Sequence, residues 1–237
     1  MNYVLAHGSW HGGWCWRPVA ERLRAAGHQV FTPSFTGMGD RAHLLRKDIT
    51  IDIFIDDLIQ VILAHELSDV ILVGHSFAGV AISGVADRIP ERLAHLVYFD
   101  AVVLENGQSA FSNYPKADAD ARIAAAARAT GGLAVPVLEH IPPVWGLEPD
   151  TADYDWVKRR LTPHPLASYT TPLVLKSPLG NDRPRTYLHC TAPSHPLLEE
   201  SRKLVRSLQG WNWLELHAPH EAHVTHPQLL SEVLLKL

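Results

Sequence analysis

The sequence predicts an α/β fold in which a mostly parallel, six-stranded sheet carries helices on both faces. Short apolar runs rich in β-branched residues alternate with stretches of helical spacing, and this alternation is typical of a parallel sheet. The 237 residues suffice for one such domain with a small insertion. A hydrophobic content of 46% is ordinary for a globular protein. We therefore expect a single α/β core without internal repeats.

Charge and cysteine content exclude several classes of protein. Lys and Arg total 21 and Asp and Glu total 25, so the net charge of −4 argues against a nucleic-acid partner. The two cysteines, Cys15 and Cys190, are far apart and favour a reduced, cytoplasmic chain over a disulfide-bonded one. The N-terminus lacks a basic leader followed by an apolar segment, and no apolar run has membrane-spanning length. We expect no membrane partner.

The first half of the core alternates between strands and helices. Pro18 in the first turn and Gly27 after the last turn delimit a helix over residues 16–26. Thr50 or Asp52 opens a second helix, which runs to about residue 67. The expected strands of this half are 3–6, 28–32, the first part of 69–82, and 93–99.

After residue 100 this alternation breaks. Residues 107–181 contain an Ala-rich helical piece at 118–129, a Gly-Gly break and many prolines. A connection this long is not a simple crossover. We expect a small helical cap at 107–181, inserted after the strand that ends at Asp100, and a core made of 1–106 and 182–237. The alternation resumes with strands at 186–190 and 213–217 and helices at 196–208 and 227–237.

One stretch, residues 69–82, joins a buried strand directly to a helix, and Ser76 stands at the junction. Such a corner requires a strained, positive-φ residue and small neighbours, which Gly74, Ala78 and Gly79 supply. The serine then stands clear of the sheet beside the free N–H groups of the helix N-terminus. The pattern resembles the G-x-S-x-G nucleophile elbow of the α/β-hydrolases, with alanine at the fifth position.

Four histidines follow the last strand at intervals of three residues. A serine hydroxyl needs a base to take its proton, and imidazole suits that role near neutral pH. One of these histidines is therefore the expected base. A metal site is the alternative, but Pro219 and Pro227 interrupt a helix, and Val224 breaks the H-E-x-x-H pattern. We expect no metal ion. The four histidines are His217, His220, His223 and His226.

The base requires an acid that holds its working tautomer. The usual position is the loop after the penultimate strand, but residues 191–196 contain no carboxylate. Asp100 ends the strand that neighbours the elbow strand, so we expect Asp100 to be the acid. Glu199 and Glu200 fall within a helix and are expected to face water. Weaker candidates are Asp182 and Asp87.

Two backbone N–H groups are expected to form the oxyanion hole. Phe77 offers one at the start of the helix, and Ser9 offers the other, because Gly8 allows the first loop to approach closely. Aromatic side chains of the cap are expected to line an apolar substrate pocket, with simple packing of the cap as the alternative. The expected pocket residues are Gly8, Trp10, His75, Phe111, Tyr114 and Trp145.

These motifs together resemble the plant methylesterase and hydroxynitrile lyase branch of the α/β-hydrolase superfamily and its bacterial esterase relatives. The resemblance implies a serine esterase, often acting on esters of aromatic or small hydrophobic acids, that needs no cofactor. It also places the base on His220. It covers most of the core and is weakest across the cap. The segments that carry it are 7–16, 25–28, 74–79, His220 and 227–228.

Two departures from that branch refine the expectation. The plant members carry an aspartate near the position of Ala192, and its absence here favours Asp100. The lyases carry threonine and lysine where this chain has Gly8 and Glu221, so the charge that stabilises a leaving cyanide is missing. We expect a carboxylesterase with a small-molecule ester as its partner. Whether the chain forms a homodimer is left open. The alternatives are a C–C hydrolase or lyase using the same Ser and His, and a non-catalytic ligand-binding protein.

Overall fold

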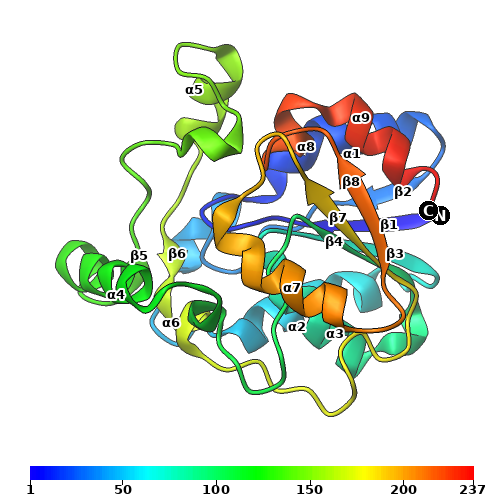
Figure 1. The fold of residues 1–237 in the computed structure, drawn as a ribbon, viewed down its shortest axis with the longest axis horizontal. Coiled ribbons are helices and arrows are strands. Elements are labelled where there is room, and N and C mark those ends of the chain that lie inside the picture. The colour runs from blue at the N-terminus through cyan, green and yellow to red at the C-terminus, as the bar shows by residue number, and fades with distance from the viewer.

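The apolar runs of the sequence form one six-stranded, wholly parallel sheet in the computed structural model, which describes residues 1–237 (Figure 1). The strand order is β2-β1-β3-β4-β7-β8. The prediction of a parallel sheet of six strands is confirmed. The strands are β1 (Asn2–Ala6), β2 (Gln29–Phe31), β3 (Val70–His75), β4 (Leu93–Phe99), β7 (Arg185–Cys190) and β8 (Asn212–Leu216).

Helices cover both faces of the sheet, because successive side chains of a strand point to opposite sides. In β3, Ile71 and Val73 join the apolar cluster beneath α1 and α9, whereas Val70 and Leu72 join the larger cluster beneath α2 and α3. The helices of the first face are α1 (Arg17–Ala25), α8 (Ala222–Thr225) and α9 (Pro227–Leu234). Those of the second face are α2 (Ile51–Ala64), α3 (Ala78–Arg88) and α7 (Glu199–Ser207).

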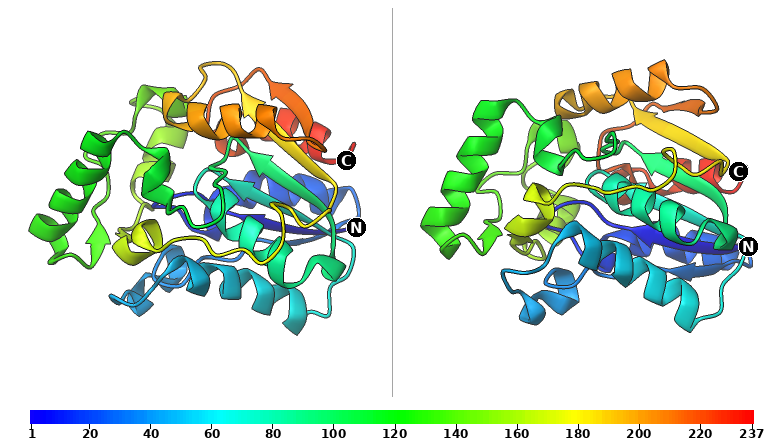
Figure 2. Two further views of the ribbon diagram at one scale, coloured as in Figure 1. Left: turned by 60° about the horizontal axis from the view of Figure 1, so that its bottom comes forward. Right: turned by 90° about the horizontal axis from the view of Figure 1, so that it is seen from below.

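The expected cap, residues 107–181, lies at the end of the sheet opposite the two chain termini (Figure 2). Because β1 starts at the N-terminus, this is the edge at which the parallel strands end. A short antiparallel pair, β5–β6, was not foreseen. The core and cap boundaries at 106/107 and 181/182 stay a prediction. The elements of this segment are α4 (Lys116–Thr130), β5 (Ala134–Val135), α5 (Ala152–Lys158), β6 (His164–Pro165) and α6 (Leu166–Thr170).

Most expected elements begin and end within a few residues of the observed ones. The expected helix at 196–208 divides into a 3₁₀ turn and α7, because Pro196 starts the turn and the α-helical hydrogen bonds begin only at Glu199. The last helix ends at Leu234 rather than at the final residue. None of the helices combines the length and the hydropathy needed to cross a bilayer. The 3₁₀ turns span Gly13–Trp16, Gly39–Leu44, Pro90–Arg92, Ala110–Asn113, Pro143–Trp145 and Pro196–Leu198.

Candidate active site

The tight turn between β3 and α3 presents Ser76 at the carboxyl edge of the sheet. Ser76 has a φ of +53°, the left-handed conformation predicted for the corner. Its N–H donates to the Phe99 carbonyl at 3.2 Å, and its carbonyl accepts from the N–H groups of Gly79 at 3.2 Å and Val102 at 2.9 Å. A Cβ on Gly79 would lie 2.2 Å from the Val102 carbonyl oxygen. This close approach, which holds the elbow against the chain after β4, therefore requires glycine.

A buried carboxylate and imidazole form a pair beside this turn. The Oδ2 atom of Asp100, just after β4, lies 2.6 Å from Nδ1 of His220, which follows β8. Asp100 is fully buried, and its Oδ1 accepts a 3.4 Å hydrogen bond from the Cys190 N–H. Asp100 also has a φ of +39°, so a second strained corner turns its side chain toward His220. The carboxylate accepts from Nδ1–H, which leaves the Nε2 atom of His220 free to take a proton.

The segment that carries His220 is held by backbone contacts from two sides. The N–H groups of His220 and Glu221 donate to the carbonyls of Val144 at 3.3 Å and Trp145 at 3.2 Å. The Nε2–H group of His75, the residue before Ser76, donates to the His220 carbonyl at 3.0 Å. Ser76 and His220 line the same cavity without a direct hydrogen bond. Catalytic hydrogen bonds of this kind often form only when substrate is bound.

Two unpaired backbone N–H groups lie near Ser76. Ser9 and Phe77 are buried, and neither of their backbone N–H groups donates to another backbone carbonyl. A Cβ on Gly8 would lie 2.9 Å from Cβ of Ser76 and 3.1 Å from Nδ1 of His75. Glycine at position 8 therefore lets the first loop lie directly against the elbow. The arrangement leaves two donors available for an oxyanion at the elbow.

The first loop is rigid because buried polar side chains hold it. Nε2 of His7 accepts from the Phe35 N–H at 3.0 Å, so Nδ1–H donates to the Gly8 carbonyl at 2.8 Å. Burial lowers the pKa of His7 to about 4, so this ring is neutral near neutral pH. The hydroxyl of Ser9 shares a 2.5 Å hydrogen bond with the hydroxyl of Tyr169. These contacts hold Gly8 and Ser9 in place at the elbow.

The elbow, the histidine and the first loop open onto one cavity of about 220 Å³. Five of the six residues expected in the substrate pocket lie on its wall; they are Gly8, Trp10, His75, Tyr114 and Trp145. Phe111 does not lie on the wall, which corrects the expectation for that residue. Its ring instead stacks on Tyr169 at 4.7 Å and is buried in the packing beneath the cap.

The sequence reasoning missed several charged or titratable side chains on the cavity wall, among them Arg122 and His195. Arg122, on α4, places its guanidinium 5.3 Å from the Trp10 ring and 4.9 Å from the Tyr114 ring. The His195 ring lies 4.6 Å from the His220 ring, and burial, followed by the charges of His220 and Arg202, lowers the pKa of His195 to about 2. No motif marks Arg122. His195 lies in residues 191–196, the segment considered above only as a position for the acid.

The four histidines after β8 do not share a face. His217 and His226 are exposed, whereas His220 and His223 are buried. The turn at Pro219 directs His220 toward Asp100, and His223 instead packs between Trp16 and His75, at 4.8 and 4.5 Å between ring centroids. The exposed His217 and His226 therefore lie apart from the buried His220 and His223.

The chain is similar in sequence to known hydrolases. The sequence profile of the alpha/beta hydrolase family matches residues 3–233. A carbendazim hydrolyzing esterase of Nocardioides sp. (strain SG-4G) is 40% identical over 245 aligned residues, which cover 100% of this chain and 99% of that protein. Methyl jasmonate esterase 1 of Vitis vinifera is 33% identical over 101 residues, 42% of this chain and 39% of its own length.

A solved structure extends the similarity to the whole fold. An extracellular alpha/beta-hydrolase from a Paenibacillus species, described as a structural and functional homologue of tobacco salicylic acid binding protein 2, superposes with a TM-score of 0.83. The two sequences are 25% identical, and the match covers 100% of this chain and 98% of the other. The similarity therefore includes the segment between β4 and β7, where the motifs of the sequence carry the least resemblance.

Proposed function

This chain belongs to the alpha/beta hydrolase family and is a carboxylic ester hydrolase, and we propose that it cleaves small hydrophobic or aromatic esters through an acyl-enzyme on Ser76. The observation that carries the proposal is the convergence of three segments on one cavity. Ser76, Ser9 and His220 line that cavity, Asp100 is hydrogen-bonded to His220, and the backbone N–H groups of Ser9 and Phe77 are unpaired. These are the parts that acyl transfer by a serine requires.

In the first half of the proposed reaction, Nε2 of His220 takes the proton of the Ser76 hydroxyl as the oxygen attacks the ester carbonyl. Asp100 stabilises the imidazolium that forms, because its carboxylate lies 2.6 Å from Nδ1 and is shielded from water. The carbonyl oxygen becomes an oxyanion, and the N–H groups of Ser9 and Phe77 bind it. Their rigid positions mean that little reorganisation accompanies the appearance of the charge.

In the second half, the tetrahedral intermediate collapses and the bond to the leaving alkoxide breaks. His220 donates its proton to the alkoxide oxygen, so the alcohol leaves neutral and the acyl group stays on Ser76. A water molecule then attacks the acyl carbonyl while His220 takes its proton. The second tetrahedral intermediate then collapses. The carboxylic acid leaves, and His220 returns the proton to the Ser76 oxygen. Apart from the ester and one water molecule, every group in these steps belongs to this chain.

The cavity supports a small substrate with one flat or branched apolar group. Trp10, Tyr114 and Trp145 supply aromatic surface, and about 220 Å³ is below the usual range of drug-sized sites. The polar groups Arg122 and His195 lie on the same wall and are suited to a substrate that also carries a hydrogen-bonding group. The full-length similarity to a carbendazim hydrolyzing esterase makes carbendazim a substrate to test.

A cytoplasmic location is also part of this proposal. Cys15 and Cys190 are both buried and unpaired, as expected for a chain kept in a reducing compartment. The expected absence of a nucleic-acid partner rests on the net charge of −4.

The proposal is tested by turnover of p-nitrophenyl acetate and butyrate and of carbendazim by the purified chain. Ser76→Ala is expected to reduce kcat by about 10³-fold or more, because the nucleophile is lost. A serine-directed fluorophosphonate is expected to label the wild-type chain on Ser76 and not the variant. Ser112→Ala, which alters an exposed serine of the cap, is the matched control and should behave as wild type.

Failure would favour one of the alternative functions. If folded protein neither turns over any ester nor reacts with the fluorophosphonate, the chain is not a serine esterase. Tight binding of aromatic acids or esters without turnover would then indicate a ligand-binding protein. Cleavage of a C–C bond or a cyanohydrin, with esters left intact, would indicate the lyase or C–C hydrolase alternative.

A further inference from the structure

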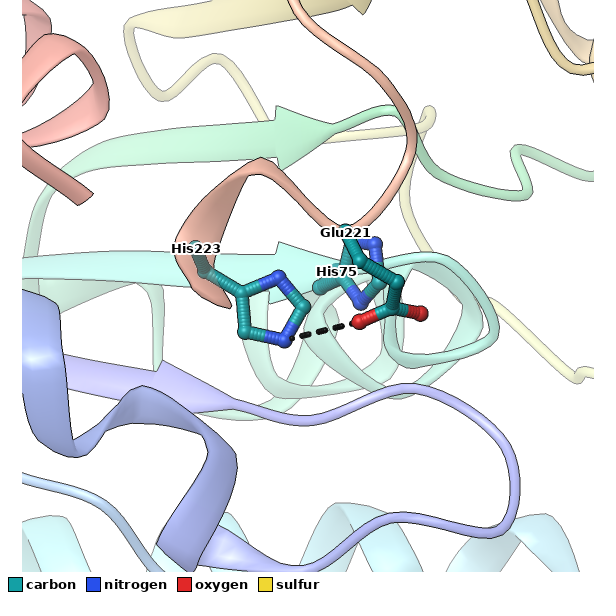
Figure 3. A group of neighbouring side chains, drawn as sticks. All are labelled: His75, Glu221 and His223. Carbon is teal, nitrogen blue, oxygen red and sulfur yellow. Dashed lines mark ion pairs between the residues drawn. The ribbon is translucent and has the colours of Figure 1, made fainter. Parts of the chain in front are cut away.

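A cluster of buried polar side chains lies directly behind His220, and the proposed ester hydrolysis does not use it. The cluster contains His11, His75, Glu221 and His223, each at most 1% exposed. Figure 3 shows the rings of His75 and His223 beside the Glu221 side chain, with a dashed line from His223 to the Glu221 carboxylate. The members come from the first loop, the end of β3 and the segment after β8. Four such groups are seldom buried together unless their polar atoms are satisfied.

Their hydrogen bonds place nitrogen lone pairs inside the cluster. Nε2–H of His75 donates to the His220 carbonyl, so the Nδ1 atom of His75 carries a lone pair and has no partner. Nδ1–H of His11 donates to the Ser9 carbonyl, so the Nε2 atom of His11 carries a lone pair and has no partner either. Neither ring can turn over without losing its bond to a backbone carbonyl.

The carboxylate adds a further lone pair at the same point. Oε2 of Glu221 lies 3.6 Å from Nε2 of His11 and 3.1 Å from Nε2 of His223, and it makes no hydrogen bond. An acceptor oxygen thus faces an acceptor nitrogen of His11 at 3.6 Å, and both side chains are buried. Such an arrangement is repulsive unless a positive centre lies between the atoms. A metal ion can be that centre, as can a proton carried by one of these groups or by a bridging water.

We propose that Nδ1 of His75, Oε2 of Glu221 and Nε2 of His223 bind one divalent transition-metal ion of the zinc class, with Nε2 of His11 as the adjacent fourth ligand. The three principal ligand atoms all lie within 4.8 Å of one another. Zinc bonds to histidine nitrogen and carboxylate oxygen are about 2.0–2.2 Å long, so ligands of a tetrahedral site are roughly 3.4 Å apart. The distances from Oε2 of Glu221 to Nε2 of His223, 3.1 Å, and to Nε2 of His11, 3.6 Å, are close to this spacing. The Nδ1 atom of His75 lies within 4.8 Å of the Glu221 and His223 ligand atoms.

The chemistry of the ligands selects the class of ion. Burial holds the pKa values of His75 and His223 well below the usual value and lowers that of His11 to about 3. The imidazoles are therefore neutral, which is the form that binds metals. Imidazole nitrogen favours zinc, copper, nickel and cobalt, whereas magnesium and calcium require mainly oxygen ligands. His11, His75 and Glu221 also line the catalytic cavity, which gives the ion a path to the site.

A bound ion would hold residues next to Ser76 and His220 in place and would not contact the substrate. Glu221 directly follows His220, and His75 directly precedes Ser76 while donating to the His220 carbonyl. An ion held by both residues would tie the nucleophile turn to the histidine segment. It would replace repulsion between lone pairs by coordination, so we expect the metal-bound chain to resist thermal unfolding better than the metal-free chain.

The test uses the purified full chain, stripped of metal with a chelator and titrated with Zn²⁺ or Co²⁺. We expect one equivalent of either ion to bind, Co²⁺ to show the visible absorption of a four-coordinate nitrogen and oxygen site, and Zn²⁺ to raise Tm by several degrees. His223→Leu and the nearly isosteric Glu221→Gln should each weaken binding at least tenfold. His217→Ala, which removes an exposed histidine of the same segment, is the matched control and should bind as wild type.

The proposal is overturned if the stripped, folded chain binds neither ion stoichiometrically, since a proton on Glu221 then serves as the positive centre. It is equally overturned if Glu221→Gln and His223→Leu, shown to be folded by circular dichroism, bind as tightly as wild type. If His223→Leu does not fold, Glu221→Gln and His11→Gln decide the outcome. These readouts do not depend on ester hydrolysis, so they stand or fall separately from the esterase assignment.

Discussion

The contact between Asp100 and His220 makes the substitution Asp100→Asn a sharp probe of the proposed mechanism. Asparagine has the same shape and tolerates the left-handed backbone that Asp100 adopts at a φ of +39°. The Cys190 N–H donates to Oδ1, so the asparagine oxygen would keep that bond and its NH₂ group would face Nδ1 of His220. Nδ1 of His220 would then have to accept a hydrogen bond from that NH₂ group, so the proton of the neutral imidazole would move to Nε2. The histidine could no longer take the proton of Ser76.

The expected magnitude follows from the lost charge. A carboxylate about 4 Å from the centre of an imidazolium contributes roughly 4 kcal/mol at an effective dielectric constant of about 20. One factor of ten in rate corresponds to about 1.4 kcal/mol, so kcat should fall by about 10³-fold. KM should change little, because Asp100 is fully buried beneath His220 and does not line the cavity.

The assay is steady-state hydrolysis of p-nitrophenyl butyrate, with circular dichroism and Tm measured on the same samples. Glu199→Gln is the matched control, since Glu199 is a carboxylate that comes after β7, near the usual position of the acid, but it pairs with Arg202 at 2.9 Å. Its kcat should stay within about twofold of wild type, because Glu199 does not line the cavity and its side chain is half exposed, while the buried Arg202 keeps its hydrogen bond to the His195 carbonyl. The reasoning is refuted if Asp100→Asn keeps more than a tenth of wild-type kcat, or if Glu199→Gln loses as much.

Three further predictions follow from the same structure. Gly8→Ala should lower kcat by about 10²-fold, because its Cβ would lie 2.9 Å from Cβ of Ser76 and displace the nucleophile; unchanged kinetics would contradict this. Tyr169→Phe should lower kcat about two- to tenfold, because it removes the 2.5 Å hydrogen bond to the Ser9 hydroxyl, whereas Tyr154→Phe should not. Urea unfolding should show stability falling from pH 7 to 5, because burial lowers the pKa of His7 from 6.5 to about 4. The unfolded chain then binds the proton below pH 6.5 while the folded chain does not, so His7 alone costs about 2 kcal/mol by pH 5. Equal or greater stability at pH 5 would refute this.

The sequence by itself determined the features that depend on a few neighbouring residues. The elbow is one, because a β-branched run, a serine and small residues at 74, 78 and 79 leave the chain few ways other than a strand, a strained corner and a helix. The placement of Asp100 could be predicted as well. In a parallel sheet the ends of neighbouring strands meet at one edge, so the acid that ends β4 had to lie near the elbow.

Only the tertiary structure decided what surrounds these groups. The cavity wall is assembled from the first loop, α4, the turn before α5 and the segments after β4, β7 and β8, and their approach depends on packing across the whole chain. That packing turned Phe111 away from the wall and brought Arg122 onto it. It also collected His11, His75, Glu221 and His223 from three distant segments. No local spacing encodes that cluster, because side chains far apart in sequence become neighbours only when the sheet and its helices have closed around them.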